Sequence, residues 1–105
     1  MNAPSTIAVA DNPDEQRYEV RVGGEVAGFA QYRVRPGQIA FTHTEVDDRF
    51  EGQGLGSKLV AFALDDVRGR GLAVLPLCPF VRAYIERHRE YADLVPEERR
   101  VRFGL

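Results

Sequence analysis

Three side chains have types and positions suited to acid–base or nucleophilic chemistry. His43 and Glu45 are two residues apart in a run of strand-forming residues, so they share one face of a strand. Either one could act as a general base, directly or through water. Cys78 follows an apolar run and precedes Pro79, a residue common in the first turn of a helix. A helix start stabilises negative charge, which makes the sulfur a candidate nucleophile.

Each of these candidates also has a purely structural interpretation. His43 can be a half-buried strand residue, Glu45 a surface carboxylate, and Cys78 a small buried apolar side chain, the commonest role of a free cysteine. The pattern His43-x-Glu45 followed by Pro76-x-Cys78 is also faintly similar to zinc deaminases, but their second cysteine would fall at Val81. We therefore expect no metal site.

A second candidate site is a glycine-rich segment between a predicted strand and a predicted helix. Gly52, Gly54 and Gly56 lie there, where the first backbone N–H groups of the helix have no partner. Glycine lets the backbone approach phosphate oxygens, and the helix dipole adds about half a positive charge. An ordinary glycine-rich turn without a ligand is the alternative. The order Gly56-Ser57-Lys58 does not match a P-loop, nor does the glycine spacing match a dinucleotide fingerprint, so we do not expect ATP, GTP or NAD binding.

The elements that must position these residues follow from the periodicity of the chain. Alternating and β-branched residues predict an antiparallel meander of three strands, at Tyr18–Val22, Val26–Val34 and Gln38–Val46. Apolar residues at helical spacing then predict a helix from Leu55 to Gly69, followed by a buried strand at Leu72–Leu77 and a second helix from Pro79. The expected fold class is α+β, with a mixed twisted sheet.

Composition sets the class of protein. The chain has 105 residues, of which 44% are hydrophobic and 29% charged, as in one soluble domain. We expect residues 1–16 to form a flexible N-terminus and residues 17–105 a single domain. The net charge of -2 offers no basic field for nucleic acid or an anionic membrane. One cysteine and the lack of an apolar run of about 18 residues predict a cytoplasmic, reduced protein.

The segment Val46–Val60, with Gly54 and Gly56 at two small positions, resembles motif A of the GCN5-related N-acetyltransferases. In that superfamily the strand end, loop and helix start hold the pyrophosphate of acetyl-coenzyme A. The resemblance implies a coenzyme-binding set of Val46, Glu51, Gly52, Gln53, Gly54, Leu55, Gly56, Ser57 and Lys58. Glu51 stands where the superfamily usually has Gln or Arg, and Asp48 where it often has Pro.

Three further segments are similar to small single-domain acetyltransferase-like proteins of the YjdJ type: His43–Val46, Cys78–Val81 and Tyr84–Tyr91. The resemblance implies that Cys78 lies near the acetyl group, either as a proton donor to the coenzyme thiolate or as an acetylated intermediate. Larger acetyltransferases often use a tyrosine of the second helix as the acid. In this sequence the same register places Ile85 at that position.

The resemblance thus implies acetyl-coenzyme A-dependent N-acetyl transfer to an amine, either a small molecule or an exposed lysine. His43, Glu45 and Cys78 are then the expected catalytic residues, and no metal takes part. A coenzyme A-binding module without turnover, acting through protein partners, is the alternative. We expect no nucleic-acid partner, because Glu97 and Glu98 offset the arginines of the C-terminal tail, and we expect a monomer or weak dimer.

Overall fold

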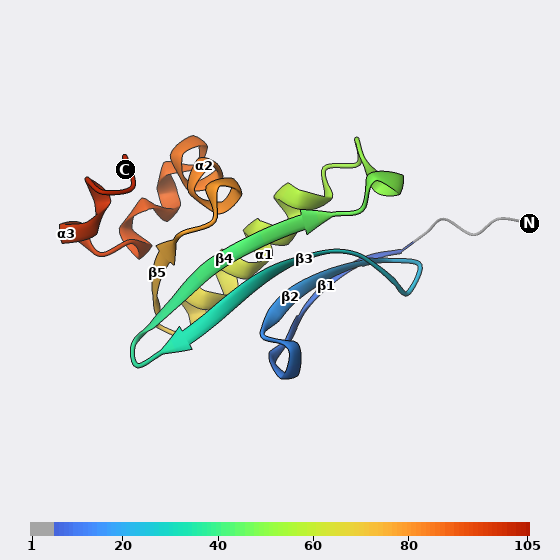
Figure 1. The fold of residues 1–105 in the computed structure, drawn as a ribbon, viewed down its shortest axis with the longest axis horizontal. Coiled ribbons are helices and arrows are strands. Elements are labelled where there is room, and N and C mark those ends of the chain that lie inside the picture. The colour runs from blue at the N-terminus through green and yellow to red at the C-terminus, as the bar shows by residue number, and fades with distance from the viewer. Residues whose placement is uncertain (1–5) are drawn as a thin grey trace, which may run out of the picture.

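Two glycines join the first two strands of the predicted meander. Gly23 and Gly24 have φ angles of 58° and 84°, the left-handed pair required by a two-residue hairpin turn. This turn connects β2 (Arg17–Val22) to β3 (Glu25–Arg35), and β4 (Gln38–Val46) pairs antiparallel with β3. The computed structural model, which describes residues 6–105, thereby confirms the three-stranded meander (Figure 1).

A further antiparallel strand, β1 (Ile7–Asn12), pairs with β2. The expectation of a flexible N-terminus is therefore wrong for residues 7–12, whereas residues 1–5 lie outside the described residues. The Asn12–Pro13 pair forms a turn. Asn12 Oδ1 accepts a hydrogen bond from the Glu15 N–H at 3.4 Å and caps the short helix η1 (Pro13–Glu15). The pattern that suggested a frayed terminus thus forms the connection between two paired strands.

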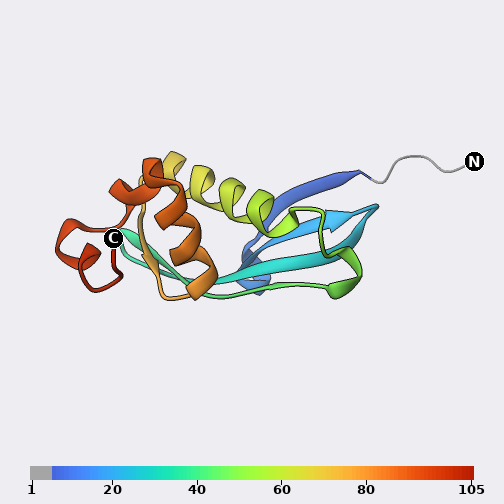
Figure 2. The ribbon, with the colours of Figure 1, turned by 90° about the horizontal axis from the view of Figure 1, so that it is seen from above.

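The sheet is mixed and has the strand order β1-β2-β3-β4-β5. Helix α1 (Leu55–Gly69) carries the chain from β4 to β5 (Ala73–Pro76), which pairs parallel with β4. Figure 2 shows α1 along one face of the sheet, which we call the helix face. In the part of the chain that the structure describes, residues 6–105, no α-helix covers the opposite face, which we call the open face. The α+β fold class predicted from the sequence is confirmed.

One continuous apolar core fills the space between α1 and the sheet. The helix buries the apolar stripe that its periodicity predicts, namely Leu55, Leu59, Val60, Ala63, Leu64 and Val67. Helix α2 (Pro79–Arg87) adds Val81, Tyr84 and Ile85, and is followed by η3 (Arg89–Leu94) and α3 (Glu97–Arg100). Within residues 6–105, none of the helices combines the length and the apolar character needed to cross a membrane.

The C-terminal end of α1 is held to the sheet by polar contacts, which we call the tyrosine–arginine network. Tyr18 donates a hydrogen bond to Asp66 at 2.6 Å, and Tyr32 donates one to Asp11 at 2.6 Å. Arg70 lies 2.9 Å from both carboxylates. Burial, followed by the hydrogen bond to a carboxylate, raises the pKa of both tyrosines well above the ordinary value. The network ties β1, β2 and β3 to the last turn of α1.

Candidate active site

Helix α1 begins without a side-chain cap. After the short helix η2 (Asp48–Phe50), the chain reaches Gly54, the N-cap residue, which has a φ of 69°. No side chain caps the helix start, and its first turn contains no acidic residue. The Lys58 N–H donates to the Gly54 carbonyl at 3.2 Å, but the earlier N–H groups have no partner within a helix. The start of α1 therefore presents free donors together with the positive end of the helix dipole.

The glycines at this helix start serve different purposes. Gly52 and Gly54 have φ angles of 84° and 69°, and a Cβ at either position would meet nothing within 4 Å. Their backbone conformation is what disfavours other residues. A Cβ at Gly56 would instead lie 2.7 Å from Cζ of Phe80. Glycine is therefore needed at position 56 so that α1 and α2 can pack closely. This requirement is separate from the approach of a ligand that the sequence suggested.

Most of the predicted coenzyme-binding residues lie together at this helix start. Those with exposed positions are Glu51, Gly52, Gln53, Gly54, Ser57 and Lys58, whereas Leu55 and Gly56 are buried and Val46 is half-buried. Leu55 thus anchors the first turn in the core and lets the flanking backbone face solvent. The structure brings the segment together as one surface around the uncapped N–H groups.

Some charged side chains near the start of α1 are ion-paired, and others are exposed without an ion-pair partner within residues 6–105. Arg49 lies 2.6 Å from Glu25 and 3.1 Å from Asp47, so it ties η2 to the β2–β3 hairpin. Its hydrogen bonds lower the pKa of Asp47. Lys58, the single lysine of the sequence, is exposed and forms no ion pair within residues 6–105. Lys58 is therefore the available cation in the first turn of α1, and Glu51 is an exposed carboxylate just before it.

Strands β4 and β5 pair only over a short length. The register runs from Gln38 opposite Ala73 to Phe41 opposite Pro76, where β5 ends. The Phe41 carbonyl accepts a hydrogen bond from the Cys78 N–H at 2.8 Å. Beyond Phe41, the last four residues of β4 (His43–Val46) pair with no strand on the β5 side within residues 6–105. Figure 1 shows β4 and the segment that follows β5 diverging. We call these four residues the free edge of β4.

A β-bulge decides which side chains of the free edge point to which face. The register with β3 shifts between Phe41 and His43, leaving Thr42 as the extra residue. In a regular strand without a bulge, alternation would place Phe41 and His43 on the same face. Instead Phe41 is buried on the helix face, Thr44 lies opposite the fully buried Ala30, and His43 projects to the open face.

Cys78 and Thr44 form a pair on the helix face. Cys78 is 3% exposed and is the N-cap residue of α2. Its Sγ donates a hydrogen bond to Thr44 Oγ1 at 3.3 Å, a distance suited to a thiol donor. The flanking Leu77 and Phe80 are partly exposed apolar side chains. The sequence analysis did not single out Thr44, and only the bulge places it on the same face as the cysteine.

His43 and Glu45 form a second pair, on the open face. His43 Nε2 lies 3.6 Å from Glu45 Oε1, and both side chains are more than half exposed. The structure therefore brings together these two members of the predicted catalytic set. It places Cys78 apart from them, because that thiol lies on the opposite face of β4. Strand β4, which carries His43 and Glu45, thus separates these two residues from Cys78.

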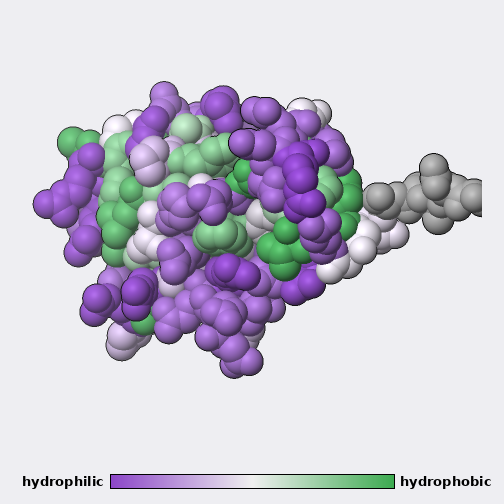
Figure 3. Space-filling model, turned by 45° about the vertical axis from the view of Figure 1, so that its right-hand side comes forward, coloured by the Kyte–Doolittle hydropathy of each residue, from purple (hydrophilic) through white to green (hydrophobic). Residues whose placement is uncertain are grey.

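A groove on the open face lies beside Glu45. Its volume is about 530 Å³, and its lining includes Arg17, Phe29, Glu45, Asp47 and Asp48. The guanidinium of Arg17 stacks on the ring of Phe29 at 4.7 Å. Figure 3 brings forward the end of the molecule that carries η2 and the turn between β2 and β3. It shows hydrophilic surface interspersed with smaller apolar areas. Asp47 is paired with Arg49, and the two remaining carboxylates, Glu45 and Asp48, outnumber the guanidinium of Arg17.

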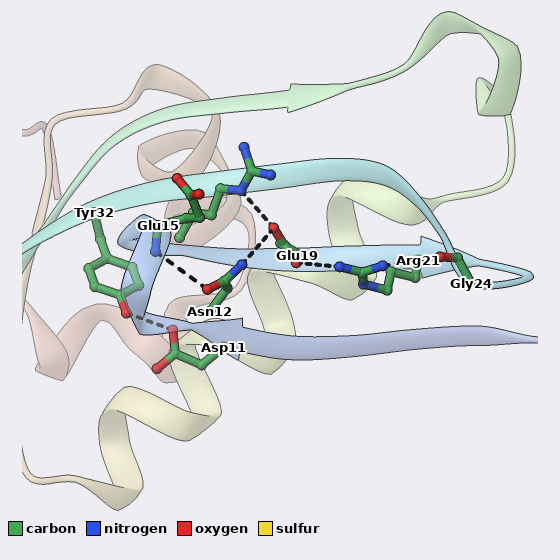
Figure 4. A network of polar contacts seen from close by, with 8 residues as sticks. Asp11, Asn12, Glu15, Glu19, Arg21, Gly24 and Tyr32 are labelled. Atoms are coloured by element: carbon green, nitrogen blue, oxygen red, sulfur yellow. Dashed lines mark hydrogen bonds and ion pairs between the residues drawn. The ribbon is translucent and has the colours of Figure 1, made fainter.

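Glu19 fixes the arginine of this groove. The carboxylate is 5% exposed and accepts hydrogen bonds from Asn12, Arg17 and Arg21 (Figure 4). Burial alone would raise the pKa of Glu19, but these hydrogen bonds outweigh it and lower the pKa. The sequence analysis missed this cluster, although the alternation Arg17-x-Glu19-x-Arg21 signals one charged face of a strand.

The residues considered from the sequence for zinc do not converge. Cys78 and His43 lie on opposite faces of β4. The ring of His88, the other histidine of the sequence, stacks on Tyr84 with centroids 4.1 Å apart. Within residues 6–105 there is no group of three or more His, Cys, Asp or Glu side chains placed to hold a metal ion.

Comparison with known proteins agrees with this architecture. The family model of the GCN5-related N-acetyl-transferases matches residues 17–94. The structure is similar to the ribosomal-protein-S18-alanine N-acetyltransferase from Escherichia coli, with a TM-score of 0.55 and 20% sequence identity over 67% of this chain. The likeness covers 64% of that protein, and it concerns the fold alone. No curated protein sequence matches the chain. On the family match, which spans β2 to η3, the chain belongs to the GCN5-related N-acetyltransferases, a family of acetyl-transferring enzymes.

Proposed function

We propose that this acetyltransferase takes its acetyl group from acetyl-coenzyme A and transfers it to an amine that binds on the open face of the sheet. The observation that carries the proposal is the uncapped, glycine-initiated start of α1 next to the free edge of β4. An anion and an extended amide-containing chain are the ligands that these two features suit. Acetyl-coenzyme A contains both, in its pyrophosphate and its pantetheine arm.

The start of α1 supports a pyrophosphate site. The N–H groups of Leu55, Gly56 and Ser57 follow the N-cap residue Gly54, and backbone donors at a helix N-terminus bind phosphate well. The exposed ammonium of Lys58 adds a full positive charge there. Glu51 opposes binding because its carboxylate is exposed near the same turn.

The free edge of β4 supports the placement of the pantetheine arm. An unpaired strand edge offers backbone donors and acceptors to an extended partner, as in β-strand addition. The two amide groups of the arm can take up this pairing. On the far side of the arm, the partly exposed Leu77 and Phe80 supply apolar contact for its methyl and methylene groups. The thioester would then lie near the point where β4 and β5 separate.

The open-face pair supports the removal of a proton from the acceptor amine. Acetyl transfer requires an amine without its extra proton and a carbonyl carbon within reach. His43 and Glu45 project beside the groove of about 530 Å³, a size that holds a small ligand. The carboxylates of the groove favour a protonated amine as the molecule that arrives. A small amine and an exposed lysine both have this charge.

Two assays test the proposal. The first is calorimetric titration of the protein with acetyl-coenzyme A. The second incubates protein and coenzyme with spermidine or with N-α-acetyl-lysine and detects the acetylated amine by mass spectrometry. We expect saturable binding and acetylation of at least one of the two amines. Substituting Cys78→Ala should retain coenzyme affinity and slow the transfer, with Cys78→Ser as the control for the size of the side chain.

The same assays distinguish the other candidate function, a coenzyme A-binding module without turnover. Binding without acetylation of either amine, together with an unchanged affinity in Cys78→Ala, would favour that module and contradict the transferase proposal. The finer likeness to YjdJ-type proteins and the cytoplasmic location stay predictions. Absence of coenzyme binding would contradict both candidates, because each depends on the start of α1.

A further inference from the structure

We propose that Thr44 is a positioning residue that holds the Cys78 thiol as the proton donor to the departing coenzyme thiolate, so that acetyl passes directly to the amine. The inference rests on the proposed function. It assigns a role to a residue with no sequence signal of its own, and it chooses between the two roles that the sequence leaves open for Cys78.

Strand β4 separates the candidate residues onto two faces of the sheet. The bulge at Thr42 sends His43 and Glu45 to the open face and Thr44 to the helix face. Cys78 hydrogen-bonds Thr44 and is therefore also on the helix face. A thioester at the free edge of β4 would be reached from one face by the amine and from the other by the thiol.

This division disfavours an acetylated cysteine. An acetyl group on Cys78 would lie on the helix face at a sulfur that is 3% exposed. An amine deprotonated by His43 or Glu45 would have to pass the strand to attack it. In direct transfer, by contrast, the amine, the thioester carbonyl and the thiol lie in series across the edge of the sheet, and nothing has to cross.

The hydroxyl of Thr44 suits both protonation states of the sulfur. In the structure Cys78 Sγ donates to Thr44 Oγ1, which orients the S–H bond. A hydroxyl can also donate, so after the thiol has given up its proton Thr44 can turn its O–H toward the thiolate. The N-terminus of α2, of which Cys78 is the N-cap, further stabilises that charge.

The resulting step balances. The amine nitrogen forms a bond to the carbonyl carbon, and the carbon–sulfur bond breaks. The protonated amine loses one proton to water by way of the His43–Glu45 pair before the attack, and a second proton goes to the same pair as the new bond forms. The coenzyme sulfur takes the proton of the Cys78 thiol. Water returns a proton to Cys78 and removes the one held by the base, which leaves an amide and free coenzyme A.

The test compares two acetyl donors, acetyl-coenzyme A and its analogue with selenium in place of the thioester sulfur. The selenolate is a far weaker base than the thiolate and leaves with little need of a proton. With acetyl-coenzyme A we expect Cys78→Ala to lower kcat on the order of 100-fold and Thr44→Val roughly tenfold. With the selenium donor both variants should recover most of the native rate. KM should change little in either case.

Two variants control for structural damage. Thr44→Ser keeps the hydroxyl and should restore most of the rate lost in Thr44→Val. Thr6→Val removes the hydroxyl of an exposed threonine that precedes β1 and should leave the rate on both donors unchanged. A lowered melting temperature in Thr44→Val alone would not produce a dependence on the donor.

Two results would overturn the inference: an equal loss with both donors in Thr44→Val, or acetyl-Cys78 detected by mass spectrometry after incubation with acetyl-coenzyme A and no amine. Either can occur in a protein that acetylates amines, so the proposed function would survive it. If the native protein acetylates neither spermidine nor N-α-acetyl-lysine, the proposed function itself fails, and the inference fails with it.

Discussion

The two ends of helix α1 are built in opposite ways. At the C-terminal end, Arg70 and the carboxylates of Asp11 and Asp66 join two tyrosine hydroxyls in a closed network. At the N-terminal end, Gly54 leaves the helix uncapped, with no acidic residue in the first turn. One end has its polar groups satisfied by the protein, and the other has no side-chain cap on its N–H groups.

The difference between the two ends of α1 shows how a small domain can use separate regions for stability and for binding. An uncapped helix start lacks a contribution of roughly 1 kcal/mol that an N-cap side chain supplies. The tyrosine–arginine network and the buried stripe of α1 hold the helix in place without that cap. Substitutions at the two ends should therefore affect different measurements: coenzyme affinity at the N-terminal end, and the free energy of unfolding at the C-terminal end.

The largest expected effect is that of Gly54→Glu on coenzyme binding. The substitution places a carboxylate at the N-cap and forces a left-handed φ on a residue with a Cβ. We expect the dissociation constant for acetyl-coenzyme A to rise on the order of 100-fold or more, equivalent to about 3 kcal/mol. Isothermal titration calorimetry measures this change.

Gly54→Asn is the matched control, because asparagine tolerates the left-handed region and carries no charge. It should bind acetyl-coenzyme A far better than Gly54→Glu. Equal affinities in native protein and Gly54→Glu would show that the start of α1 does not hold the coenzyme.

The second effect is a loss of stability at alkaline pH that originates at the C-terminal end. Burial and the hydrogen bond to Asp65 raise the pKa of Tyr91 to about 12, and the pKa values of Tyr18 and Tyr32 are raised as well. Above about pH 10 the unfolded chain releases tyrosine protons that the folded chain keeps. The free energy of unfolding should then fall by up to about 1.4 kcal/mol per pH unit for each such tyrosine.

Urea unfolding between pH 8 and roughly pH 12 tests this pH dependence across the ordinary tyrosine pKa. Stability contributed by these tyrosines is fully present below pH 10 and is lost as the pH rises through their folded-state values. A free energy of unfolding that stays constant across this range would contradict the description of the network.

The third effect is that of Tyr18→Phe, which removes one hydroxyl of the network and leaves the ring. Loss of the hydrogen bond to Asp66 should lower the free energy of unfolding by about 1 kcal/mol at neutral pH. The substitution should also flatten the alkaline slope. Because Tyr18 contacts the far end of α1, we expect the affinity for acetyl-coenzyme A to stay within about twofold of native. A large loss of affinity would mean that the two ends are coupled.

The smallest expected effect is that of Glu51→Gln. Removing an exposed carboxylate near the helix start should strengthen coenzyme binding by a few-fold at low salt, since isolated surface charges contribute roughly 1 kcal/mol or less. The gain should shrink as salt is added. Titrations at two salt concentrations measure it. Glu90→Gln, a surface substitution on η3, serves as the control that changes net charge equally.

The elements of the fold were predictable where periodicity is strong. The Gly23–Gly24 turn, the stripe of α1 and the apolar run of β5 each follow from local sequence. Strand β1 was not predicted, because a short alternating stretch beside Asn12–Pro13 has the same signals as a loose terminus. Its order comes from pairing with β2, a contact between residues separated in sequence.

The proximity of two candidate residues was predictable from the sequence, whereas the separation of the candidate residues onto two faces of β4 was not. The two-residue spacing of His43 and Glu45 gives their shared face, and the structure brings them together. A bulge shifts every later side chain of a strand to the other face, and no local signal marks the one at Thr42. Predicting the hydrogen bond between Cys78 and Thr44 therefore requires knowledge of the register between β3 and β4 and of the path of the chain after β5.

The most direct test of the central claim is a calorimetric cycle of two proteins and two ligands. Native protein and Gly54→Glu are each titrated with acetyl-coenzyme A and with S-acetylpantetheine, which lacks the pyrophosphate. We predict that Gly54→Glu loses most of its affinity for acetyl-coenzyme A and little for S-acetylpantetheine. An equal loss for both ligands, or for neither, would contradict the assignment of the start of α1 as the pyrophosphate site.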